Sequence, residues 1–277
     1  ATDLTSAAFI AAFIRFISRR GKPHQMYSDN GGNFVAANKE LAEMYALVRS
    51  KDHNDKMYNK LAEDEINWNF NPPAAPHMGG LWEATVKSCK YHLKRVLGPT
   101  PLTYEEFATF LAQVEACLNS RPLWKSSEDP NDVAALSPGH FLIGAPLTAI
   151  AEPDLTELKC NALDRWQHVQ QMTQHFWSRW SSEYLHHLQK RTKWDRIHNN
   201  VKEGDVVVII EDNTPPQKWK LGKILELHHN PSDPQNLIRT VTVKTAEGVY
   251  KRPIHRLCLL PTEESNELQI DENQCTI

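Results

Sequence analysis

Two short segments place carboxylates in settings that suit catalysis by metal ions. Asp29 lies in the segment 27–34 (YSDNGGNF), directly before a pair of glycines, and Glu83 follows the glycine-containing segment 76–80 (PHMGG). Carboxylates that are brought together repel each other unless a cation lies between them, and hard oxygen ligands select Mg²⁺ or Mn²⁺. Pairs of such ions drive in-line displacement at a phosphodiester. Asp29 and Glu83 are therefore candidate metal ligands and catalytic residues.

Each of these carboxylates also has a structural interpretation. An Asp before two glycines is common in turns, where its side chain accepts hydrogen bonds from the nearby backbone. A Glu in the first turn of a helix is stabilised by the helix dipole without any catalytic role. Residue type and spacing alone leave both interpretations open.

The elements expected around the two carboxylates are those of a mixed α/β domain. Apolar residues at helical spacing predict a helix over 5–19, with Thr5 as its N-cap. A short strand is expected over 24–27, so Asp29 follows a strand end, where active-site groups of open sheets collect. The pattern predicts another strand over 66–70 and further helices over 36–64, 81–97, 103–118 and 162–196.

The C-terminal third has a different pattern. Short apolar runs separated by turn residues predict strands near 205–210, 219–227, 240–245, 248–252 and 256–260. That many short strands in so few residues are typical of a small β-barrel.

Composition sets broad limits on the class of protein. The chain has 277 residues, of which 40% are hydrophobic and 23% charged, as in globular proteins of about two domains. Its net charge of −3 gives no support for nucleic-acid binding, although phosphate contacts need only a local basic surface. Five cysteines without a Cys-x-x-Cys pair favour neither a zinc ribbon nor a disulfide framework. No apolar run is long enough to span a membrane, and we expect no membrane partner.

Four collinear segments together resemble the integrase of BEL/Pao-type retrotransposons. They are SDNGGNFV at 28–35, WNFNPPAAPHMGGLWEATVKS at 68–88, LNSRPL at 118–123 and LSPGHFLIGAPL at 136–147. The resemblance implies an RNase H-like catalytic core and metal-dependent strand transfer of element DNA into a host genome. It also implies an Asp-Asp-Glu triad, with Asp29 as the second aspartate and Glu83 as the glutamate, both binding Mg²⁺ or Mn²⁺. DNA is then the partner, a homo-oligomer the expected assembly and the nucleus the expected location.

The sequence departs from the family at its start. The triad's first aspartate lies on the first strand of the fold, before the first helix, and this sequence starts just before that helix. Asp3 does not match the missing aspartate. The first strands and the N-terminal zinc-binding domain are also unmatched. We therefore expect a fragment of a longer integrase that has no strand-transfer activity by itself, because two-metal catalysis needs the third carboxylate.

The expected fold class is α/β plus all-β, in four parts. A partial RNase H-like core over 1–125 precedes a linker with a long amphipathic helix over 126–200. An SH3-like β-barrel over 201–262 and an acidic disordered tail over 263–277 complete the chain.

Two sets of basic residues are candidate DNA contacts. Lys87, Lys90 and Lys94 follow Glu83 at helical spacing and can track phosphates along one helix face. In the expected barrel the candidates are Lys220, Lys223, Lys251 and Arg252. The structural alternatives are a solvated helix face and strands that alternate buried and charged residues. A further basic cluster lies at 190–194 (KRTKW), His77 is expected to form loop hydrogen bonds, and Trp82 is expected to pack on the core.

Two functions from different classes remain after the sequence is considered. One is the integrase fragment described above. The other is a non-catalytic nucleic-acid-binding remnant or domesticated module. A hydrolase finds no support, because neither a nucleophile elbow nor a His-Glu-x-x-His motif is present.

Overall fold

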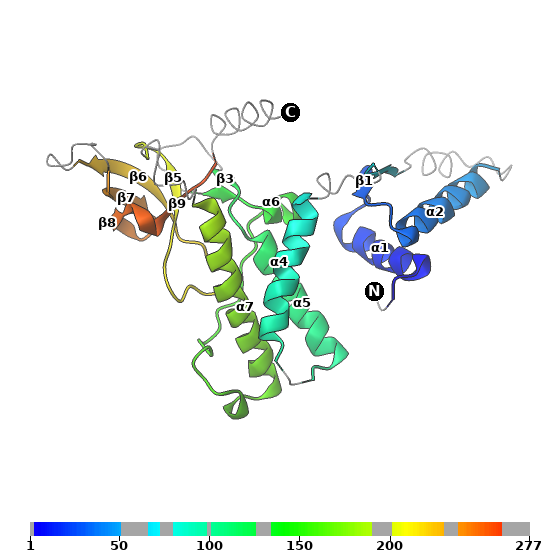
Figure 1. The fold of residues 1–277 in the computed structure, drawn as a ribbon, viewed down its shortest axis with the longest axis horizontal. Helices are drawn as coiled ribbons and strands as arrows, with labels where there is room; N and C mark the ends of the chain where they lie inside the picture. Colours follow the sequence, from blue (N-terminus) through cyan, green and yellow to red (C-terminus); the bar gives the residue numbers. More distant parts are fainter. Residues whose placement is uncertain are drawn as a thin grey trace. The chain divides into compact units, whose positions relative to one another are not determined.

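The computed structural model of the protein describes residues 3–50, 66–72, 80–98, 101–125, 134–189, 201–229 and 238–261. The chain forms two compact units, Ala1–Ser88 and Cys89–Ile277. Both helices and strands are present, as expected for the mixed fold class (Figure 1). The four-part division proposed from the sequence stays a prediction.

The first unit pairs two parallel strands with two helices. Helix α1 (Ser6–Arg20) precedes β1 (Gln25–Ser28), and α2 (Gly32–Ser50) precedes β2 (Asn67–Phe70). The strands are parallel, with Met26 opposite Trp68. The helix expected over 5–19 and both expected strands are confirmed. Residues 51–65, which include the end of the helix expected over 36–64, lie outside the described residues.

Aromatic side chains hold this unit together. The ring of Phe9 lies 4.9 Å from the ring of Phe34 and 5.6 Å from that of Trp68, centroid to centroid. The Trp68 indole donates a hydrogen bond of 2.9 Å to the Ser28 hydroxyl. These contacts fix the end of β1, from which the Asp29 turn departs.

The helices of the second unit enclose an apolar core. Helix α4 (Gly80–Val96) contains the division between the units, and α5 (Tyr104–Asn119), α6 (Pro138–Ile143) and α7 (Arg165–Leu188) follow it. The core joins residues of α5 to residues of α7 and includes Phe110, Val114, Val169, Met172 and Phe176. Cys89, Leu93 and Val96 of α4 pack against it. The capping box expected at Thr103 and Glu106 is confirmed.

Two short strands and a 3-10 helix connect these helices. Strands β3 (Trp124–Lys125) and β4 (Ala135–Leu136) form an antiparallel pair. A short 3-10 helix, η2 (Cys160–Ala162), precedes α7. Asp164 caps α7 by accepting a 2.7 Å hydrogen bond from the Gln167 amide.

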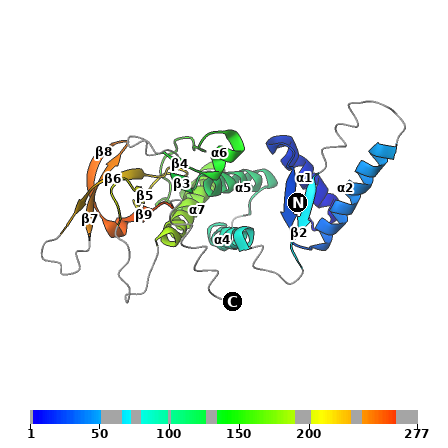
Figure 2. The same ribbon diagram turned by 90° about the horizontal axis from the view of Figure 1, so that it is seen from above.

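The five expected C-terminal strands form one antiparallel sheet. They are β5 (Val206–Ile209), β6 (Leu221–His228), β7 (Thr240–Thr245), β8 (Gly248–Pro253) and β9 (Leu257–Leu259), in the order β8-β7-β6-β5-β9. The 3-10 helix η3 (Ile254–Arg256) connects the last two strands. Closure into a barrel was expected, but β8 and β9 remain the two edges of the described sheet (Figure 2). The alternation of buried and partly buried residues along β7 gives the sheet one apolar face.

One tryptophan joins the helices to the sheet. Trp219 packs against Trp177, with ring centroids 4.8 Å apart, and its indole donates a 3.1 Å hydrogen bond to the Ser120 hydroxyl. A second contact is the thiol of Cys258, which donates to the Leu185 carbonyl over 3.3 Å. The sheet and the helices of this unit therefore share buried surface. Across the described ranges, no helix is both long and apolar enough to cross a bilayer.

Candidate functional site

Asp29 forms a tight turn directly after β1. Its Oδ1 atom accepts a 3.0 Å hydrogen bond from the Gly31 amide, and the Asn30 side chain donates to the Asn71 carbonyl over 2.6 Å. A Cβ atom on Gly31 would lie 3.0 Å from Asp29 Oδ1 and 2.9 Å from Asn33 Oδ1, so a larger residue here would displace these two side chains. Asp29 thus has the turn role that its residue type allowed.

Glu83 lies in the first turn of α4, where it is exposed. The preceding residues 73–79, including His77, lie outside the described residues. Carboxylate oxygens suit Mg²⁺ or Mn²⁺. Within the described ranges, however, no group of three or more His, Cys, Asp or Glu side chains is placed to hold a metal ion. Within those ranges, Asp29 and Glu83 are not part of such a group.

The lysine row, defined as Lys87, Lys90 and Lys94, lies on α4, and all three side chains are exposed. Between them, Cys89 and Leu93 face the core and anchor the helix. The row is therefore presented on an ordered support, which suits contact with a phosphate backbone. Trp82 is 38% exposed and belongs to none of the described core clusters, so its expected packing on the core is wrong.

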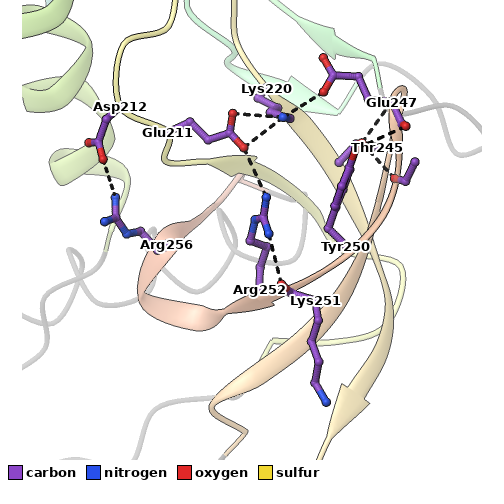
Figure 3. A network of polar contacts seen from close by, with 10 residues as sticks. Glu211, Asp212, Lys220, Thr245, Glu247, Tyr250, Lys251, Arg252 and Arg256 are labelled. Atoms are coloured by element: carbon purple, nitrogen blue, oxygen red, sulfur yellow. Dashed lines mark hydrogen bonds and ion pairs between the residues drawn. The ribbon is translucent and has the colours of Figure 1, made fainter.

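The sheet's basic residues are matched by carboxylates (Figure 3). Lys220 Nζ lies 3.0 Å from an oxygen of Glu211 and 3.0 Å from an oxygen of Glu247. These bonds, to Glu247 first and Glu211 second, raise the pKa of Lys220. Arg252 lies 3.6 Å from Glu211 and stacks over Tyr250 at 5.1 Å from its ring centroid. Lys220 and Arg252 are therefore committed to contacts within the protein.

The other two candidate DNA contacts of the sheet, Lys223 and Lys251, differ in their exposure to solvent. Lys223 is only 9% exposed, which argues against a phosphate contact. Lys251 is exposed, and its side chain points away from the network of ion pairs (Figure 3). The four candidate DNA contacts of this region thus lie in three environments. The basic cluster at 190–194 falls outside the described residues.

The sequence analysis missed the acidic partners of this network. Glu211 precedes β6 and Glu247 lies in the turn between β7 and β8, so they meet Lys220 only through the fold. The spacing between acids and bases along the chain gave no signal for these pairs.

Comparison with known proteins adds one match. Residues 164–260 match a family described as a family of unknown function, DUF5641. The matched segment begins at Asp164, the N-cap of α7, and ends at the buried residue Leu260 after β9. It therefore covers α7 together with the five-stranded sheet. A comparison with curated proteins found no significant match.

Proposed function

We propose that the chain is part of a retroelement integrase and that it binds duplex DNA through phosphate contacts from α4. The observation that carries this proposal is the lysine row. Its three cations are exposed on a helix whose opposite side is anchored to the core. Phosphate contacts of this kind supply affinity without sequence preference.

The architecture supports an RNase H-like assignment of the first unit. Two parallel strands pair beside two helices, and Asp29 follows the carboxyl end of β1. Ligands and catalytic groups of open α/β sheets collect at such strand ends. The strand order of the C-terminal sheet and the 3-10 helix before its last strand agree with an SH3-like domain.

The sheet makes a smaller contribution to DNA affinity in this proposal. A phosphate that approached Lys220 or Arg252 would have to compete with Glu211 and Glu247 for their donors. It would also meet the repulsion of those carboxylates. Lys251 is the exposed basic residue of this set and adds one contact.

The complete integrase, in this proposal, transfers strands with Mg²⁺ or Mn²⁺ held by Asp29, Glu83 and a further carboxylate. It works in the nucleus as a homo-oligomer. The second candidate is a non-catalytic DNA-binding module. We expect the purified chain to join no DNA ends in Mg²⁺ or Mn²⁺, and metal-dependent joining would contradict this.

The DNA proposal is tested by titrating fluorescent duplex DNA with the chain across a salt series. Each phosphate contact contributes about 0.9 to the slope of log K against log salt concentration. The variant Lys87→Gln/Lys90→Gln/Lys94→Gln should lower the slope by about 2–3 and weaken binding at every salt concentration.

A charge-matched control keeps this test specific. The variant Lys39→Gln/Lys159→Gln/Lys202→Gln removes three exposed lysines from other elements. It should change binding little. Equal loss in both variants would mean that only net charge matters, and unchanged binding in the first would remove the lysine row from the interface.

A further inference from the structure

A large cleft follows α7 within the second unit. Its volume is about 990 Å³, and the segment 149–157 and the loop 209–220 contribute its walls. Both segments lie on the same side of α7 (Figure 1). The helix contributes small side chains to the floor, including Ser178 and Ser182, which leave room above it. From Trp166 to His186 the lined part of α7 is about 30 Å long, at 1.5 Å per residue.

The cleft is acidic. Arg179, Lys218 and Lys220 line it together with three histidines, and Lys220 is already paired with Glu211 and Glu247. Six carboxylates line it, and Glu183, Glu211 and Asp212 among them are paired with His92, Lys220 and Arg256. The acidic part of the cleft is therefore its wall 149–157, which carries Glu152, Asp154 and Glu157. Such a surface repels a phosphate backbone and attracts cations.

Buried amides hold one acidic wall in place. Gln174 accepts a 2.9 Å hydrogen bond from the Leu155 amide and donates to the Pro153 carbonyl over 2.8 Å. Gln171 donates to the carbonyls of Leu155 and Leu158, each over 2.7 Å. The backbone that carries the carboxylates of this wall is therefore ordered before any ligand arrives, which lowers the entropic cost of binding.

The cleft lining also includes a buried histidine. His92 is 4% exposed, and its Nε2 atom lies 2.9 Å from Glu183 Oε2. Its Nδ1 atom is buried and has no partner among the described residues.

An exposed aromatic ring also lines the cleft. Trp166 is 52% exposed at one end of the cleft. A ring face near carboxylates attracts ammonium and guanidinium groups through the ring quadrupole. Cations, N–H donors and aliphatic stems together describe lysine and arginine side chains.

We propose that this cleft binds an extended lysine- and arginine-rich segment of a partner protein. About nine residues of extended chain, at about 3.3 Å each, match the length of α7 that lines it. The charge of the cleft sets this surface apart from the lysine row on α4, and the proposal does not depend on DNA binding.

The test uses a fluorescein-labelled nonapeptide of alternating Lys and Ala, with a Glu-Ala counterpart, and measures anisotropy with the full chain. The basic peptide should bind and the acidic one should not. The variant Glu152→Gln/Asp154→Asn/Glu157→Gln should weaken binding at least tenfold, because it removes three positioned charges. Asn at position 154 keeps the oxygen that accepts from the Thr156 amide, so the turn is retained.

Two further variants distinguish peptide binding in the cleft from attraction by the negative charge of the whole protein. Glu105→Gln/Glu203→Gln/Glu226→Gln removes three exposed carboxylates that do not line the cleft and should leave binding within twofold. Ser178→Trp fills the floor at an exposed helix position without changing charge and should also weaken binding at least tenfold. Unchanged binding in Ser178→Trp, or equal loss in both triple variants, would overturn the proposal. Ser178→Trp should leave DNA affinity unchanged, so failure of the cleft proposal can be distinguished from failure of the proposal that α4 binds DNA.

Discussion

A single carboxylate, Glu106, connects the starts of two helices. It accepts a 2.7 Å hydrogen bond from the Thr103 amide at the N-terminus of α5. It also accepts two hydrogen bonds, of 2.6 and 2.5 Å, from the guanidinium of Arg165 in the first turn of α7. The Arg165 bonds first, and the Thr103 bond second, lower the pKa of Glu106 from 4.5 to about 2.

This pKa makes the contribution of Glu106 to stability depend on pH. The pKa is lower in the folded than in the unfolded chain, so the stabilisation is present above pH 4.5 and is lost as pH falls toward 2. We expect wild type to exceed Glu106→Gln in free energy of unfolding at pH 7, with a gap that closes across that window. Urea unfolding at a series of pH values measures it. Glu105→Gln, at the exposed neighbouring position, should show no such window, and a gap independent of pH would refute the assignment.

At this scale, the sequence predicted local partners and missed distant ones. The capping box at Thr103 and Glu106 follows from a spacing of three residues within one helix start. Arg165 lies 59 positions from Glu106, and no local pattern connects them. The turn contact between Asp29 and Gly31 is also local, and the sequence allowed it to be predicted. The ion pair of Lys220 with Glu247 joins distant positions and was missed.

At the scale of elements, β6 illustrates how closely the sheet is packed. A Cβ atom on Gly222 would lie 2.4 Å from a methyl carbon of Val243 on β7 and 3.2 Å from the Lys244 carbonyl oxygen. Neither neighbour can withdraw easily, because Val243 is fully buried and Lys244 O belongs to the backbone. Only glycine fits between these strands.

We expect Gly222→Ala to lower the free energy of unfolding by about 1–3 kcal/mol through overpacking. Gly32→Ala is the control, since nothing lies within 4 Å of the added methyl group at the start of α2. Chemical denaturation of both variants, followed by circular dichroism, gives the comparison. A loss of equal size in the two variants would contradict the packing argument.

The periodicity of the sequence predicted the elements better than their assembly. Short apolar runs separated by turn residues predicted the strands of the region β5 to β9. The number of short strands also suggested a closed barrel, whereas β8 and β9 remain edges of the described sheet. Closure of a sheet depends on its twist and on bulges such as the one between Ile224 and Glu226 in β6. Neither feature can be predicted from the residue pattern.

At the scale of the whole molecule, Trp219 joins the helices and the sheet of the second unit. Its ring lies 4.8 Å from Trp177, 6.0 Å from Trp180 and 5.7 Å from Tyr184, centroid to centroid. It packs against the helical core and against the cluster that contains Val206 and Cys258. One side chain therefore belongs to both cores.

We expect Trp219→Ala to lower the free energy of unfolding by about 3 kcal/mol, near the lower end for removal of a large aromatic side chain. Loss of the shared contact should also separate the unfolding of α5 and α7 from that of the sheet. Hydrogen exchange of the two regions detects this separation. Trp166→Ala, which removes a half-exposed ring, should have a small effect, and similar losses in both variants would argue against the joining role.

Global properties of the sequence gave little guidance about surfaces. The net charge of −3 concealed both the basic row on α4 and the acidic cleft along α7. The cleft was not predicted because its walls come from 149–157 and 209–220, two segments without helical or strand periodicity. The resemblance to integrases predicted DNA contacts by the lysines of α4 and predicted no cleft along α7.

The pairing of β5 with β9 has a consequence for synthesis of the protein. Val207 and Val208, buried in the sheet, find their last backbone partners at Leu259 and Cys258, about fifty residues later. Until the ribosome has released that segment, β5 presents an unpaired apolar edge that other nascent chains could join. Truncation before residue 257 should therefore yield aggregated polypeptide rather than a smaller folded sheet. We expect such products to be degraded.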